Sequence, residues 1–271
     1  MTSDRINFYV INLDRSVDRL ERFTKDFEAF PIPFLRVSGI EGKDLTIPIE
    51  DYDAFMFFMH TGRDASPGEI GCYLSHLKAL KMFLESGKEF ALICEDDAMP
   101  APECYEAIEQ MIAHSETWDM LRCVIAGHAG SQRKSFPYLP LTPNYSLSTT
   151  ITGVVTATAY IVNRRAAEIL VRKLVPMTNL YDTALFLGRM EIKEATIFPY
   201  CMLLSEDDKN STVGRGLKRK LKPWHLVFWT CRFYRLHVRV VRYSLQFLRL
   251  FQRRFAAKRH TRARHTPPKK E

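Results

Sequence analysis

The sequence predicts an α/β domain built on a mainly parallel sheet, followed by a basic amphipathic helix. The chain opens with a strand, a helix and a second strand joined by short links, a pattern typical of parallel sheets. A short apolar run at 90–94 suits a further buried strand. Between 232 and 253, arginines and one glutamine recur at alternating steps of three and four residues, which is one stripe of a helix.

Charge divides the chain into parts. Residues 215–271 hold 18 of the 39 Lys and Arg but one of the 31 Asp and Glu, which gives a net charge of +17 there and −9 in 1–214. An acidic body of that length can bury one good core. We therefore expect a folded domain at 1–214, a basic amphipathic helix region at 215–257 and a disordered basic tail at 258–271.

The cysteines and the N-terminus favour a cytoplasmic protein. None of the six cysteines forms a Cys-x-x-Cys pair, and several lie in apolar runs, which indicates buried, reduced thiols rather than a disulfide framework or zinc site. The first residues lead directly into a strand pattern, without an apolar segment long enough for a signal peptide. No uninterrupted apolar run reaches the roughly 18 residues that cross a bilayer.

The first strand is expected at 6–13, where apolar residues surround two asparagines. A helix follows, with Ser16 as its N-cap, and a second strand is expected at 34–38. In parallel sheets, ligands bind outside the carboxyl ends of the strands. The polar residues at these two strand ends are therefore ligand-binding candidates, with ordinary polar loop residues as the equal alternative: Asn12, Arg15, Ser38 and Glu41.

The next helix has a strong start signal. Residues 66–69 read Ser-Pro-Gly-Glu, which fits a capping box with proline at the first helical position. This helix would carry an apolar face and end near Gly87. Ser75 and His76 lie within it, and His76 is either a ligand to metal or substrate or an ordinary packing histidine. The preceding stretch, 47–61, is too apolar for a solvated loop and is expected to pack over the sheet or to line a cleft.

Three adjacent carboxylates, Glu95, Asp96 and Asp97, follow the apolar run at 90–94. Like charges at one place are costly unless a cation neutralises them. Because side chains alternate along a strand, Glu95 and Asp97 are expected on one face and Asp96 on the other. Two oxygen ligands with open coordination positions suit Mg²⁺ or Mn²⁺ bound together with substrate phosphates. The alternative is a solvated acidic turn.

The remainder of the acidic body alternates helix and strand patterns. Residues 131–152 hold three prolines and many Ser and Thr, so we expect a long loop that serves as a lid or binding loop. A polar loop is expected at 203–216. The other expected elements are helices at 104–112, at 164–174 and from Asp182, and strands at 119–125, 156–162 and 195–200.

The basic helix region combines its arginine stripe with apolar and aromatic residues elsewhere on the helix. Such a helix suits an anionic membrane surface, where each basic residue contributes about 1 kcal/mol, and we expect 224–255 to bind one. The alternative is docking on the acidic body, with arginine side chains covering apolar surface. Nucleic-acid binding is disfavoured, because a strand-binding groove interleaves aromatic and basic residues.

Several motifs together resemble glycosyltransferase family 25, whose members build bacterial lipopolysaccharide or lipooligosaccharide. The resemblance covers about 6–212, and its most specific piece is Gly-Glu-Ile-Gly-Cys-Tyr-Leu-Ser-His at 68–76. The other pieces are Tyr-Val-Ile-Asn-Leu-Asp-Arg-Ser-Val-Asp-Arg at 9–19, Val-Ser-Gly-Ile-Glu-Gly at 37–42, Ile-Cys-Glu-Asp-Asp-Ala at 93–98, Ala-Thr-Ala-Tyr-Ile-Val at 157–162 and Tyr-Asp at 181–182.

The resemblance implies a GT-A-like single nucleotide-sugar-binding domain with a mixed, mainly parallel sheet. It implies inverting transfer of a hexose, galactose most often, from a UDP-sugar to a lipid-linked lipooligosaccharide or lipopolysaccharide acceptor. That acceptor places the protein on the inner face of the bacterial inner membrane. Glu95 and Asp97 would hold Mn²⁺ or Mg²⁺, and Asp182 would be the catalytic base, with Asp207 second and a simple helix cap as the alternative role of Asp182. The donor-binding residues would be Asn12, Arg15, Arg19, Ser38, Glu41, Glu69, Ser75, His76 and Asp96.

Two other classes of function fit the same residues. A metal-dependent phosphohydrolase acting on a nucleotide or sugar phosphate would also use clustered acids after a strand, and it would release phosphate without an acceptor. A catalytically inactive membrane-surface adaptor would keep the fold. It would tolerate changes at Glu95 and Asp97 but not the loss of 224–271.

Overall fold

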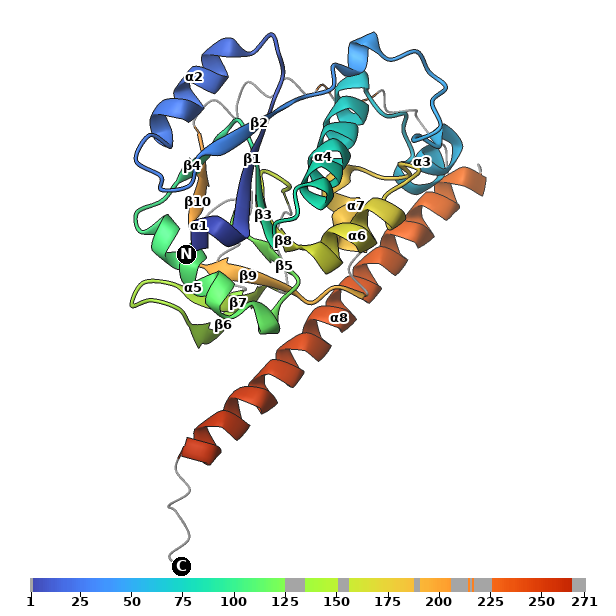
Figure 1. Cartoon of the computed structure of the whole chain (residues 1–271). Helices are drawn as coiled ribbons and strands as arrows, with labels where there is room; N and C mark the ends of the chain where they lie inside the picture. Colours follow the sequence, from blue (N-terminus) through green and yellow to red (C-terminus); the bar gives the residue numbers. More distant parts are fainter. Residues whose placement is uncertain are drawn as a thin grey trace, which may run out of the picture.

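The computed structural model describes residues 2–124, 135–150, 156–187, 191–205, 214, 216 and 226–264. Helices cover both faces of an eight-stranded mixed sheet, and one long helix runs past the body toward the C-terminus (Figure 1). The predicted α/β class and mixed sheet are confirmed.

The sheet has the strand order β2-β1-β3-β8-β5-β9-β7-β6. Parallel pairing joins β1 to both β2 and β3, and β5 to β9, so the carboxyl ends of the first three strands lie at one edge of the sheet. The other neighbours in the sheet are antiparallel. The strands are β1 (Ile6–Asn12), β2 (Phe34–Ser38), β3 (Phe90–Glu95), β5 (Met120–Arg122), β6 (Ser135–Pro140), β7 (Ser146–Thr150), β8 (Ala159–Asn163) and β9 (Glu194–Phe198), with β4 (Ala98–Pro100) and β10 (Met202–Leu204) in a separate antiparallel pair.

Two apolar cores lie on opposite faces of the sheet. Strand alternation divides β1 between them, because Tyr9 and Ile11 pack on one side and Phe8 and Val10 on the other. Helices α4, α6 and α7 cover the first face, and α2 and α5 cover the second. The helices are α1 (Thr2–Arg5), α2 (Val17–Asp26), α3 (Ala54–Thr61), α4 (Pro67–Glu85), α5 (Cys104–Ala113), α6 (Arg164–Lys173), α7 (Tyr181–Leu187) and α8 (Leu226–Arg264), with short 3-10 turns at Gly42–Asp44 and Ser115–Thr117.

The start of α4 follows the predicted capping box. The Ser66 hydroxyl accepts from the backbone N–H of Glu69, and the Glu69 carboxylate accepts from the backbone N–H of Ser66. Pro67 occupies the first turn, where its missing N–H costs nothing. The cap fixes the position at which α4 meets the sheet. Ser16 also precedes its helix as expected, but its side chain makes no capping hydrogen bond.

The prediction of a long loop at 131–152 is wrong for residues 135–150, which the structure describes. Strands β6 and β7 form an antiparallel hairpin there, with an irregular register beside Pro137. Strand β6 is the last strand of the described sheet, and proline is tolerated at an edge because no ladder hydrogen bond is lost. The polar loop expected from 203 is also shorter, since β10 includes residues 203 and 204.

Helix α8 is a single helix of 39 residues that packs against α3, β6 and β7. The Tyr234 ring stacks on His60 of α3 with 3.8 Å between ring centroids. Its hydroxyl accepts from Asn179 Nδ2 at 2.9 Å, and the Cys231 thiol donates to the backbone oxygen of Met59 at 3.0 Å. One face of this helix therefore docks on the acidic body, which was the alternative to membrane binding.

The opposite face of α8 exposes a ridge of apolar side chains at steps of three and four residues, which we call the outer ridge. Arg232, Arg235 and Arg239 are exposed beside it. The outer ridge consists of Trp229, Phe233, Leu236, Val240, Tyr243, Phe247 and Phe251. In the described part of the chain, no helix has both the length and the apolar character needed to cross a bilayer.

Candidate active site

A pocket opens at the carboxyl ends of β1 and β3, beside the first turns of α4. Segments that follow β1 and β2 form its other walls. This is the position at which ligands bind in open α/β sheets. Seven of the predicted site residues line it: Arg15, Arg19, Glu41, Ser75, Glu95, Asp96 and Asp97.

The three acidic residues do not alternate as predicted. Strand β3 ends at Glu95, and residues 96–97 form a turn. Because Asp97 lies outside the strand, strand alternation does not place its side chain on the same face as that of Glu95. Arg19 instead forms ion pairs with both Asp96 and Asp97, the second at 3.6 Å. Glu95 faces α4. Arg19 thus pairs with the two aspartates of the turn, whereas Glu95 is held separately.

Asn12 and Asp96 form a buried pair beneath the pocket. Asn12 Nδ2 donates to Asp96 Oδ2 at 2.8 Å and to the backbone oxygen of Ser16 at 2.9 Å, while Arg36 donates to Asn12 Oδ1. Burial raises the pKa of Asp96, and the charge of Arg19 and the Asn12 hydrogen bond oppose that rise. Asn12 therefore holds the acidic turn in place and does not itself line the pocket.

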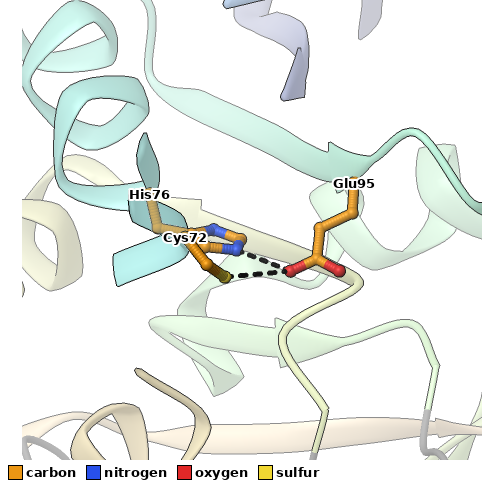
Figure 2. A group of neighbouring side chains, drawn as sticks. All are labelled: Cys72, His76 and Glu95. Carbon is orange, nitrogen blue, oxygen red and sulfur yellow. Dashed lines mark hydrogen bonds and ion pairs between the residues drawn. The ribbon is translucent and has the colours of Figure 1, made fainter. Parts of the chain in front are cut away.

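Glu95 is held by two residues of α4 (Figure 2). His76 Nε2 lies 3.0 Å from Glu95 Oε1, and the Cys72 thiol lies 3.7 Å from the same oxygen. Burial opposes ionisation of Glu95, but the hydrogen bonds from His76 and Cys72 outweigh it and lower the pKa of Glu95. Burial and the charge of Glu95 raise the pKa of the Cys72 thiol.

His76 continues this network away from the pocket. Its Nδ1 lies 3.2 Å from the hydroxyl of Tyr160, which in turn lies 2.9 Å from the hydroxyl of Tyr181. The Tyr181 ring stacks on His76 with 4.2 Å between centroids. His76 is completely buried and does not line the pocket. It therefore lacks the direct contact with a bound donor that was predicted for it.

Two glycines allow the loop after β2 to meet α4. A Cβ at Gly71 would lie 2.3 Å from the Ile40 oxygen, and one at Gly42 would lie 1.6 Å from the Pro67 oxygen. Ser75 joins the same two segments, because its hydroxyl accepts from Ile40 N–H and donates to the Gly71 oxygen, both at 2.7 Å. These contacts explain one glycine in each of the two sequence motifs, Gly42 and Gly71.

The remaining donor-binding candidates divide into two groups. Arg15 and Glu41 pair at 2.6 Å at the mouth of the pocket. Ser38 donates to Asp14, and Glu69 pairs with Arg63 in addition to capping α4, so the side chains of Ser38 and Glu69 are engaged elsewhere. Neither lines the pocket.

Asp182 lies in the first turn of α7, next to Tyr181. Its carboxylate accepts from the backbone N–H of Thr183 at 2.5 Å and from the Thr183 hydroxyl at 3.2 Å. Burial raises its pKa, with opposing contributions from Thr183 and the Arg122 charge, while Glu95 adds to the rise. Asp182 does not itself line the pocket. Asp207, the second base candidate, lies outside the described residues.

Sequence reasoning missed three residues around this network: Cys72, Arg122 and Tyr160. Arg122 is 2% exposed, donates from Nε to Glu194 at 2.8 Å, and donates from a terminal nitrogen to the Thr156 oxygen at 2.6 Å. Cys72 and His76 stand four residues apart on one helix, which is a signal that the sequence did contain. Tyr160 lies in the motif at 157–162, although that motif did not indicate its role, and nothing in the sequence marks Arg122.

The chain is similar in sequence to a known protein family and to several of its members. A family model described as glycosyltransferase family 25 (LPS biosynthesis protein) matches residues 5–185. Procollagen galactosyltransferase 1 of Danio rerio is 29% identical over 104 residues, which cover 35% of this chain and 17% of that protein. Procollagen galactosyltransferase 1-B of Xenopus laevis is 31% identical over 103 residues, with the same 35% and 17% coverage. The match therefore spans about a sixth of these relatives.

Similarity to solved structures is weaker. A197 from STIV aligns with a TM-score of 0.41 and 11% identity, covering 82% of this chain and 100% of that one. A glycosyltransferase involved in the glycosylation of the major capsid of PBCV-1 aligns with a TM-score of 0.26 and 13% identity, covering 60% and 62%. Likeness at this level assigns neither activity nor substrate.

Proposed function

The chain belongs to glycosyltransferase family 25, and we propose that it transfers a hexose from a UDP-sugar to a lipooligosaccharide or lipopolysaccharide acceptor, with inversion. Galactose is the first sugar to test, because curated relatives are galactosyltransferases. The observation that carries the proposal is the charged pocket at the ends of β1 and β3, formed by the family's own motifs. In that pocket, acidic residues and arginines lie side by side.

The donor would bind with its diphosphate among the charged residues of the pocket. Arg15, Arg19 and Lys43 line the pocket and are suited to phosphate oxygens. The family resemblance also implies Mn²⁺ or Mg²⁺. Its fit rests on the donor set, because Glu95 and Asp97 offer hard oxygen atoms in the pocket, and Arg19 is the basic residue that pairs with Asp97. When bound, such a cation supplies Lewis-acid neutralisation of the leaving diphosphate.

Asp182 is the proposed general base. An inverting transfer needs a carboxylate that accepts the proton of the acceptor hydroxyl as the new bond forms. Burial raises the pKa of Asp182, which brings its basicity closer to that of an effective base at neutral pH. The negative charge of Glu95, which lines the pocket, adds to the same rise in the pKa of Asp182.

Helix α8 would hold the protein on its lipid-linked acceptor. We propose that the outer ridge and the adjacent arginines adsorb to an anionic membrane surface, with the body (1–214) and the basic C-terminal part (215–271) as functional parts. The expected boundary between a helix at 215–257 and a disordered tail at 258–271 is wrong, because α8 continues to Arg264. An acceptor of this kind places the protein on the cytoplasmic face of the bacterial inner membrane. The face of α8 that docks on α3 leaves the outer ridge available for that contact.

The test is sugar transfer by the purified full chain. UDP-galactose or UDP-glucose is offered with detergent-solubilised lipooligosaccharide, in Mn²⁺ or in EDTA, to the native protein and to Asp97→Asn. We expect cation-dependent transfer that falls at least about a hundredfold in the variant, as for lost charge stabilisation. Transfer that survives both EDTA and Asp97→Asn would exclude the cation site.

The same assay separates the alternatives. A phosphohydrolase would release phosphate from the nucleotide sugar at the same rate with or without acceptor. An inactive adaptor would neither transfer nor hydrolyse, and its vesicle binding would be unchanged by Asp97→Asn. Either result would overturn the proposed transfer.

A further inference from the structure

Three potential metal ligands converge at the inner wall of the pocket: Cys72, His76 and Glu95. Their sulfur, nitrogen and oxygen atoms all lie within 4.8 Å of one another (Figure 2). Among the residues that the structure describes, no other three His, Cys, Asp or Glu side chains come this close. Two of the three come from one face of α4, and the third comes from the end of β3.

The spacing of these atoms is close to that of a tetrahedral site, with the separation of His76 and Glu95 a few tenths of an ångström short of it. Bonds of about 2.0–2.3 Å to a zinc-class ion place neighbouring ligand atoms about 3.3–3.7 Å apart. The observed separations are 3.0 Å from His76 Nε2 to Glu95 Oε1 and 3.7 Å from the Cys72 sulfur to the same oxygen. A thiol, an imidazole and one carboxylate form a donor set of borderline softness, which favours zinc over magnesium or calcium.

The histidine is already oriented as a metal ligand. Its Nδ1 lies 3.2 Å from the Tyr160 hydroxyl, and Tyr160 is held in turn by the Tyr181 hydroxyl at 2.9 Å. A hydrogen-bond partner on the second ring nitrogen is the usual support of a ligating histidine, because it fixes the tautomer and the ring plane. Nε2 is thereby directed at Glu95 and Cys72.

The cluster is reached from the pocket. Cys72 and Glu95 both line the pocket, whereas His76 closes the site from behind and is completely buried. Three protein ligands leave the fourth position of a tetrahedral ion without a protein ligand. A structural site with four protein ligands would have no such opening.

We propose that Cys72, His76 and Glu95 form a binding site for a zinc-class divalent cation, with an open position toward the pocket. This site shares Glu95 with the Mn²⁺ or Mg²⁺ position proposed for the donor diphosphate, but its other two ligands are a thiol and an imidazole, and its test does not depend on the proposed sugar transfer. The spacing of the cysteines did not predict it, because Glu95 joins the site only through the packing of α4 on β3.

The test is titration of the full-length, metal-free protein with Co²⁺, which reports thiolate ligation by a charge-transfer band in the near ultraviolet. We expect one equivalent per chain, loss of the band in Cys72→Ser, and displacement of Co²⁺ by Zn²⁺. Tyr160→Phe keeps the buried ring but removes the support of His76, and should weaken Zn²⁺ binding by about tenfold.

The control addresses the other thiols. Cys104, Cys123 and Cys201 lie in mutual contact through Cys201 on the far side of the sheet, so Cys104→Ser tests them as a competing site. The band should survive Cys104→Ser and also Asp97→Asn. No band, a band unaffected by Cys72→Ser, or a band lost in Cys104→Ser would overturn the proposal. Near-ultraviolet circular dichroism of each variant checks that it is folded.

Failure of this site and failure of the proposed function remain distinguishable. Absent sugar transfer with an intact cobalt band would overturn the transferase assignment alone. Transfer by a protein without the band would overturn the metal site alone.

Discussion

Two histidine–tyrosine stacks stand in different regions of the molecule and do different things. His76 of α4 stacks on Tyr181 at 4.2 Å, and His60 of α3 stacks on Tyr234 of α8 at 3.8 Å. The ring planes are inclined by 11° in the first pair and 9° in the second, so the pairs are nearly identical as ring contacts. Their surroundings differ.

The difference lies in what the histidine nitrogens bind. His76 is completely buried and joins the Glu95 carboxylate to the Tyr160 hydroxyl. His60 is half-buried, and its Nδ1 meets the backbone oxygen of Thr178 and the side chain of Asn179. The first stack therefore belongs to a charged network at the pocket, whereas the second fastens α8 to the body. Stacking geometry alone does not identify a functional histidine.

The largest expected effect is the loss of sugar transfer on changing Asp182, which lies beside the first stack. Asp182 follows Tyr181 directly, so this stack holds the turn that presents the proposed base. Asp182→Asn should lower the rate of sugar transfer by about 10²–10⁴-fold, the usual contribution of a general base. Steady-state assays at saturating donor measure it. An unchanged rate would remove Asp182 from the chemistry.

The pH dependence of this variant has a definite sign. A buried carboxyl whose pKa is raised in the folded protein favours folding below its unfolded pKa, and that contribution is lost as pH rises through the folded pKa. At neutral pH, Asp182→Asn should therefore leave the free energy of unfolding unchanged or increase it. Transfer by the native protein should decline as pH falls through the raised pKa of Asp182.

The second prediction compares the stacks directly. His76→Ala removes a buried ring and leaves the Glu95 carboxylate without its main partner, which should cost about 2–4 kcal/mol of unfolding free energy. His60→Ala is the matched control, since it removes an equivalent stack from a half-exposed position, and it should cost about 1 kcal/mol and preserve transfer. Urea denaturation measures both. Equal losses of unfolding free energy in the two variants would show that the two stacks do not differ in their contribution to stability.

The third prediction concerns what the second stack holds in place. The double change Phe233→Ser and Phe247→Ser removes two exposed rings of the outer ridge. Binding to vesicles of phosphatidylglycerol should weaken by about tenfold, with less than about 0.5 kcal/mol change in unfolding free energy. Arg172→Gln, an exposed arginine of the body, is the control and should leave vesicle binding unchanged. Unaltered binding by the double variant would exclude the outer ridge as the membrane contact.

The smallest expected effect is a pH dependence of α8 docking. Burial lowers the pKa of His60, so the neutral ring is favoured in the docked state. The resulting stability is present above the unfolded pKa of histidine and is lost as pH falls through the lowered pKa. Hydrogen exchange across the first turns of α8 should therefore accelerate at mildly acidic pH. Exchange that is independent of pH beyond its intrinsic chemistry would contradict this coupling.

Local signals in the sequence predicted much of the scaffold. The capping box at Ser66 and Glu69 is as expected, because both partners lie within one helical turn. The buried strand before Glu95 and the position of the pocket also follow from short patterns. Family membership, recognised from the motifs at 68–76 and 93–98, is confirmed by the match over residues 5–185.

Features that depend on long-range packing were not predictable. The acidic turn was misread because strand alternation stops at Glu95, where the chain turns to place Asp96 and Asp97 against Arg19. The hairpin of β6 and β7 was hidden by prolines, which only an edge position makes acceptable. The contacts of Tyr160 with His76 join positions 84 residues apart, and no local pattern encodes them.

The packing of α8 against β6 and β7 has a consequence for aggregation. Strand β6 ends the described sheet, and an edge strand is a template on which a second chain can add a strand. A helix lying against these last two strands hinders the addition of a strand from another chain. The prolines of β6 also lack the backbone N–H groups that such a strand would pair with. Truncation before residue 226 should therefore expose the edge of the sheet to pairing with other chains. Precipitation of such a shortened chain would then indicate loss of this protection of the edge strand rather than failure of the body to fold.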